Sequence, residues 1–119
     1  MCRKDNPLPY QKHWKSTKRD WERDEVLAWT AGRKGEAQYS KLVFADQREV
    51  QALELLCINH GTEITPGGGG VRKFYMKCDK VIGACSGVLT EYIFAQCDSK
   101  GYHGRPISPA ALAAFGVQI

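Results

Sequence analysis

Apolar and polar positions alternate most clearly in two stretches of the second half of the chain. Residues 71–78 (VRKFYMKC) place two different sets of side chains on the two faces of a strand. The first set is Arg72, Phe74, Met76 and Cys78, and the second is Lys73, Tyr75 and Lys77. Residues 88–97 (VLTEYIFAQC) form the most β-prone stretch of the chain. We predict that these stretches are antiparallel neighbours, joined by residues 79–87 as a hairpin connection or as a third short strand with bulges at Gly83 and Gly87.

Near the N-terminus, apolar residues recur at helical spacing, at Tyr10, Trp14, Trp21 and Ala28. This pattern predicts an N-terminal helix, either continuous or in two pieces with Asp20 capping the second. Residues 1–9 contain two prolines and are expected to form an extended lead-in to that helix.

Two further helices are predicted from their capping residues. Asp46 followed by Glu49 is a capping-box pattern, and the helix that it starts should end at Gly61. Ser108, followed by a proline, should begin a short C-terminal helix that Gly116 closes.

The segments between these elements complete a single α+β domain over residues 1–119. Residues 38–45 read as a short strand, residues 62–65 can begin the sheet, and residues 98–106 read as a loop. The predicted fold is a small antiparallel sheet of three to four strands covered by an N-terminal helix, a central helix and a short C-terminal helix. Its core should contain Trp21, Val50, Leu53, Phe74, Tyr92, Phe94, Leu112 and Phe115.

Composition places the chain among ordinary globular proteins, with 43% hydrophobic and 25% charged residues. No apolar run approaches the roughly 20 residues that a membrane helix needs, so we expect no membrane association. The first residues lack the apolar stretch of a secretion signal. The sequence therefore predicts a cytoplasmic protein whose five cysteines are reduced thiols.

The net charge of +4 is confined to one end of the chain. Residues 1–20 hold six basic and two acidic side chains, and the remaining residues balance to zero. A solvated N-terminal segment explains this layout, and so does an electrostatic contact with phosphate or an acidic protein surface. The candidate contact residues for nucleic acid or a protein partner are Lys12, Lys15, Lys18 and Arg19. Replacing the three lysines with Gln should then weaken anion binding and flatten its salt dependence.

A run of four glycines at 67–70 leaves backbone amides unshielded, and Arg72 and Lys73 follow closely. Such amides can form an anion-binding nest that nearby cations strengthen. The candidate ligand-binding residues here are Gly68, Gly69, Gly70, Arg72 and Lys73. A flexible hairpin tip is the alternative, because no Gly-Lys-Ser/Thr of a P-loop follows.

The stretch Lys100 to Pro106 (KGYHGRP) supplies the second set of candidate ligand-binding residues, Tyr102, His103 and Arg105. Arginine offers a planar fork for phosphate, and the charge of a histidine changes near neutral pH. If the two predicted strands are antiparallel neighbours, the glycine loop and this stretch meet at one end of the sheet. We therefore expect Arg72, Lys73, His103 and Arg105 to share one anionic ligand. A polar surface turn is the alternative.

Metal binding and catalysis have weaker support. Cys57 and His60 have C-x-x-H spacing, but no C-x-x-C knuckle is present. Cys97 with His103 or His60 could form a thiolate pair in space, yet no nucleophile motif surrounds any cysteine. We accordingly predict no catalytic residue, no metal site and no cofactor.

The favoured hypothesis is a small non-enzymatic binding module for an anionic ligand, either nucleic acid or a phosphorylated ligand. One alternative is a phage or mobile-element type of inhibitor that docks its basic helix on a protein partner. A small Cys/His-dependent enzyme is the second alternative. A steep salt dependence of binding to nucleic acid would favour the first hypothesis.

Overall fold

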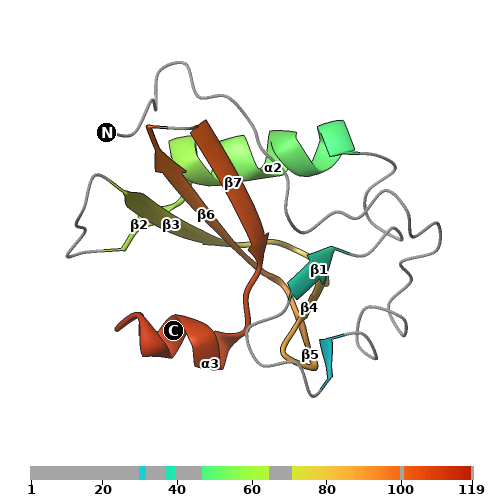
Figure 1. Ribbon diagram of the computed structural model, residues 1–119. Coiled ribbons are helices and arrows are strands. Elements are labelled where there is room, and N and C mark those ends of the chain that lie inside the picture. The colour runs from blue at the N-terminus through green and yellow to red at the C-terminus, as the bar shows by residue number, and fades with distance from the viewer. Residues whose placement is uncertain (1–29, 32–36, 40–46, 65–70, 100, 119) are drawn as a thin grey trace.

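A computed structural model describes residues 30–31, 37–39, 47–64, 71–99 and 101–118. Within these ranges the chain forms two antiparallel sheets and two complete α-helices, so the described part is α+β, as predicted. The predicted N-terminal helix falls on residues outside these ranges. Figure 1 shows α2 and α3 on different sides of the larger sheet.

The elements have the following bounds. The helices are α2 (Gln47–His60) and α3 (Pro109–Ala114). The four-stranded sheet contains, in order, β2 (Thr62–Glu63), β3 (Arg72–Lys77), β6 (Tyr92–Asp98) and β7 (Gly101–Pro106). The three-stranded sheet has the order β1-β4-β5, from Ala37–Tyr39, Gly83–Cys85 and Val88–Thr90. The central and C-terminal helices thus lie where the capping residues predicted them.

One face of the four-stranded sheet packs against α2. A cluster of buried residues fills the space between this face and α2. Its members come from α2, from alternate positions of β3, β6 and β7, and from β1 and the residue before β4. They are Tyr39, Val50, Cys57, Ile58, Phe74, Ile82, Ile93, Ala95, Cys97 and Tyr102. Glycine at position 104 lets α2 approach β7 closely, since a Cβ there would lie 3.0 Å from Cγ of Glu54.

The opposite face packs against α3. Ile64, Phe94, Ile107 and Leu112 form its buried cluster, and Phe115 packs on them. The Ser108 side chain caps α3 by accepting a hydrogen bond from Ala111 N, and Gly116 follows the helix at φ 85°. These are the residues that the sequence marked for the two ends of the helix.

The β4–β5 hairpin turns through Ser86 and Gly87. Both residues have positive φ, at 51° and 83°, as a two-residue turn of the hairpin type requires. Gly87 N donates a 3.0 Å hydrogen bond to Oγ1 of Thr30, which ties the turn to the segment before β1. The connection at 79–87 therefore contains a short strand, β4, as the second of the two predicted alternatives has it, and is not a simple hairpin loop.

Two predictions about the sheet were wrong. Residues 98–106 were expected to be a loop, but Gly101–Pro106 form β7, which pairs with β6 at all six positions. Two glycines and a proline give this segment low β-propensity, and pairing with β6 overrides that propensity. The second error is the expectation of one sheet, because residues 88–97 divide at Glu91 into strands of two different sheets.

Predicted core positions are confirmed at Val50, Phe74, Phe94 and Leu112, which are buried. Three others are only half-buried: Leu53, Tyr92 and Phe115. Trp21 lies outside the described residues.

The expectation that all the cysteines are reduced thiols holds for three of the described cysteines and not for Cys97. Cys57, Cys78 and Cys85 are free, but Cys97 is disulfide-bonded. No helix in the described part of the chain is long and apolar enough to cross a membrane.

Candidate functional site

The face of the four-stranded sheet that packs against α3 carries the candidate site, and we call it the α3 face. Strand alternation assigns side chains to it, since successive side chains point to opposite faces. Its members are Lys73, Tyr75 and Lys77 of β3, Tyr92, Phe94, Gln96 and Asp98 of β6, and His103 and Arg105 of β7. Lys73, Gln96 and His103 lie in one cross-strand row, and Tyr75, Phe94 and Arg105 lie in the next row.

Two aromatic rings stack at the centre of this face. The ring centroids of Phe94 and Phe115 are 5.3 Å apart, and their planes differ by 9°. Each ring carries a cation. Nζ of Lys73 lies 5.4 Å from the Phe115 centroid, and Cζ of Arg105 lies 5.1 Å from the Phe94 centroid. The faces of aromatic rings attract such cations, so these contacts fix where both side chains lie.

Neither of these cations is neutralised within the described part of the chain. The Lys73 ammonium and the Arg105 guanidinium make no ion pair with a described carboxylate. Nε of Arg105 is buried and has no hydrogen-bond partner there. The residue as a whole is half-buried, so an anion would bind the part of the Arg105 guanidinium that remains accessible and not the buried Nε.

Arg72, by contrast, lies on the opposite face of the sheet, the one that packs against α2 (the α2 face), and it is already paired. Its guanidinium donates to both carboxylate oxygens of Glu63, from Nη2 at 2.6 Å and from Nε at 2.9 Å. This hydrogen bonding raises the pKa of Arg72. The expected convergence of these four side chains is therefore incomplete, because Arg72 faces away from Lys73, His103 and Arg105.

The remaining predicted site residues are distributed as follows. Tyr102 is buried on the α2 face, where its hydroxyl approaches Gln51 O at 3.4 Å and burial raises its pKa. His103 is 8% exposed and lies within β7 rather than in a loop. The start of β3 does lie beside the end of β6, with Arg72 opposite Cys97. The other candidates lie outside the described residues: Gly68, Gly69, Gly70, Lys12, Lys15, Lys18 and Arg19.

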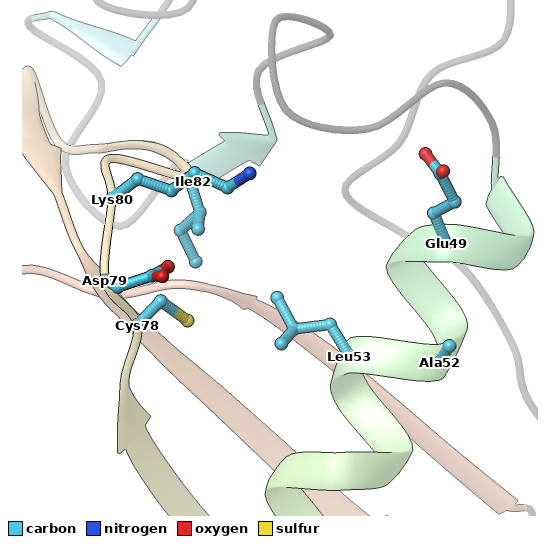
Figure 2. Close-up of a pocket in the computed structure, with 7 residues that line it drawn as sticks. All are labelled: Glu49, Ala52, Leu53, Cys78, Asp79, Lys80 and Ile82. Carbon is cyan, nitrogen blue, oxygen red and sulfur yellow. The ribbon is translucent and has the colours of Figure 1, made fainter.

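A separate pocket lies between α2 and the segment after β3. It encloses about 330 Å³, and Figure 2 shows Leu53 pointing from α2 toward Cys78 on the other wall. Burial raises the pKa of the Cys78 thiol to about 11, and the nearby Asp79 adds to this effect. The thiol form therefore dominates at neutral pH, which makes Cys78 a poor nucleophile. The charged groups of Asp79 and Lys80 belong to exposed residues, so water can solvate them.

A second thiol on the α2 face is equally unsuited to nucleophilic chemistry. Burial raises the pKa of Cys57 far above its ordinary value, and the neighbouring Cys78 and Glu54 add to this effect. Within the described ranges, no group of three or more His, Cys, Asp or Glu side chains could hold a metal ion. The thiols of Cys57 and Cys78 are therefore both protonated at neutral pH.

The sequence did not reveal the most important partners on the α3 face. Phe94 and Phe115 were predicted as core residues, and the predicted site did not include them. Arg105 could have been linked to Phe94 only through the pairing of β7 with β6. The available signal was weak alternation at 101–105, which two glycines obscure.

Comparisons with known proteins identify no relative. No protein-family model, no curated protein and no solved structure matches this chain. Function must therefore be inferred from the geometry of the chain itself.

Proposed function

We propose that this chain is a binding module for single-stranded nucleic acid, which lies along the α3 face. The observation that carries the proposal is the arrangement of Lys73 and Arg105. Both lie over the stacked Phe94 and Phe115 rings, and neither has an ion-pair partner among the described residues.

The chemistry of the face suits an unpaired strand. Lysine and arginine side chains neutralise phosphates, and arginine can donate two parallel hydrogen bonds to one phosphate. Half-buried aromatic rings on the same face, those of Tyr75 and Tyr92, leave surface for bases to stack on. The part of this face that α3 leaves uncovered can follow the backbone of a nucleic-acid strand while bases lie on the rings.

The charges of this face favour a polyanion. Lys77 also lies on this face, and its Nζ is 3.9 Å from Oε1 of Glu91. Both side chains are exposed, so this ion pair contributes little to stability. Strand alternation also places the acidic Asp98 on the α3 face. It lies at the end of β6 and not in the cross-strand row that contains Arg105. The raised pKa values of Cys57 and Cys78 favour a binding role over thiol catalysis. A cytoplasmic location belongs to this proposal, as an expectation from the sequence.

The test is fluorescence anisotropy with a short labelled single-stranded oligonucleotide at about 50 and 200 mM salt. The full chain should bind with a steep salt dependence. Lys73→Gln and Arg105→Gln should each weaken binding and reduce the slope of log affinity against log salt by about 1. Arg72→Gln is the matched control, because Arg72 lies on the α2 face and already pairs with Glu63.

Two outcomes would contradict the proposal. One is the absence of oligonucleotide binding by the full chain at low salt. The other is an Arg72→Gln loss as large as the Arg105→Gln loss, because it would show a general charge effect rather than a site on the α3 face.

A further inference from the structure

A cavity of about 450 Å³ opens beside Arg105, between α3 and the β4–β5 turn. This volume lies within the range of small-molecule sites. Its walls are mostly apolar on the side of α3, where Ala110, Ala111, Ala114 and Phe115 line it. Arg105, Cys85, Ser86 and Ser108 line the rest.

Arg105 gives this cavity its chemical preference. The guanidinium is held over the Phe94 ring at 5.1 Å, and its buried Nε has no hydrogen-bond partner in the described ranges. Arg105 is half-buried, so part of the residue remains accessible to a ligand in the cavity. An oxyanion that enters the cavity can accept parallel hydrogen bonds from the planar fork, so phosphate is a fitting partner.

The rest of the wall suits a planar organic body. The Phe115 ring and the alanine methyl groups supply apolar surface, and the hydroxyls of Ser86 and Ser108 can hydrogen-bond the edge of a heterocycle.

We propose that this cavity binds one nucleoside monophosphate unit, with the phosphate on Arg105 and the base against Phe115 and the α3 alanines. The inference rests on the proposed function, because Arg105 also belongs to the α3 face. The unit has two possible sources, a free nucleotide or the phosphorylated end of a strand, and both present the same chemistry to the cavity.

The test is isothermal titration of the full chain with a nucleoside monophosphate, with the matching nucleoside and with inorganic phosphate. The monophosphate should bind at least about tenfold more tightly than either part alone, because only it uses both walls. Ala114→Leu should fill the cavity and weaken monophosphate binding by at least about tenfold. Ala113→Leu is the matched control, since Ala113 is on the same helix, is exposed and does not line the cavity.

The folding of both variants is checked by their thermal midpoints, which should stay close to that of the unmodified chain because both positions are exposed. Oligonucleotides with and without a terminal phosphate identify the source of the unit. If a terminal phosphate strengthens oligonucleotide binding and Ala114→Leu abolishes this increase in affinity, the cavity binds the ends of strands. Binding of the monophosphate without that gain assigns it to free nucleotides.

The possible failures are distinguishable. If the oligonucleotide binds but the monophosphate does not, the cavity proposal is overturned and the proposed function stands. If neither ligand binds, both proposals are overturned. Equal binding of nucleoside and monophosphate, or equal losses in Ala113→Leu and Ala114→Leu, would also overturn the cavity proposal.

Discussion

The hydroxyl of Tyr39 donates a 2.7 Å hydrogen bond to Oε2 of Glu54, and both side chains are fully buried. Tyr39 belongs to β1 and Glu54 to α2, so this bond links the three-stranded sheet to the helix that covers the larger sheet. Burial raises the pKa of Tyr39 well above its ordinary value, and the neighbouring Glu54 carboxyl adds to this effect. The hydroxyl therefore keeps its proton and remains a donor throughout the neutral range.

Tyr39→Phe should lower the free energy of unfolding by about 1–3 kcal/mol, because a buried carboxyl loses a donor. Urea denaturation measures this loss. Tyr102→Phe is the control, since its hydroxyl bond to Gln51 O is longer, at 3.4 Å, and its removal should cost less than about 1 kcal/mol. A double-mutant cycle of Tyr39→Phe with Glu54→Gln should give a coupling energy of at least about 0.5 kcal/mol. Additive losses would contradict a direct interaction.

Stability should fall as the pH rises above about 9, where free cysteine thiols deprotonate. Burial raises the pKa of Cys57 far above that value and the pKa of Cys78 to about 11. A pKa that is higher in the folded state stabilises the fold below the unfolded-state pKa, and this contribution is lost as the pH rises through the folded-state value. Above pH 10 the raised pKa of Tyr39 acts in the same direction.

The measurement is the free energy of unfolding between about pH 7 and 11, where each proton contributes a slope of at most about 1.4 kcal/mol per pH unit. Cys78→Ala should make the alkaline decline shallower, because it removes one of the shifted groups. A pH-independent stability across this range would contradict the prediction.

Thiol labelling should distinguish Cys97 from the three free cysteines. In denaturant without reductant, an alkylating reagent should modify Cys57, Cys78 and Cys85, while Cys97 should react only after reduction. In the native state Cys78 should react before Cys57 and Cys85, which are buried. Its reaction should still be slower than that of an exposed cysteine, because its pKa is raised. Peptide mass spectrometry identifies the modified sites, and alkylation of Cys97 without reductant would contradict the disulfide.

The elements that the sequence predicted correctly have local signals. The central helix has a capping-box pattern at its start and a glycine at its end, and β3 has clear alternation between Arg72 and Lys77. That alternation also assigned Arg72 and Lys73 to opposite faces, as the register confirms. Signals of this kind depend on neighbouring residues and need no knowledge of the fold.

The features that were missed depend on contacts between distant residues. β7 is a strand because β6 pairs with it, and that pairing places His103 and Arg105 on the face opposite Tyr102. Interpreting the segment as a loop removed this alternation from the predicted site. Glu54 was equally hidden, because a helical carboxylate is usually exposed, and here Tyr39 comes from a strand 15 residues away.

Gly104 should tolerate no side chain, because the backbone of β7 lies close both to the neighbouring strand β6 and to the helix α2 at this position. A Cβ there would lie 2.5 Å from Phe94 O of β6 and 3.0 Å from Cγ of the buried Glu54. The carbonyl of Phe94 is held by the β6–β7 register, so the strands would have to separate to admit a methyl group. Gly104→Ala should therefore lower the free energy of unfolding by about 3 kcal/mol, at the upper end of the usual cost of overpacking.

Gly116→Ala is the comparison, since a Cβ there meets nothing within 4 Å and only the positive φ of 85° opposes it. It should cost about 1 kcal/mol. Urea denaturation of both variants gives the order of the two losses, and a Gly104→Ala loss no larger than that of Gly116→Ala would show that α2 and β6 can move away from β7.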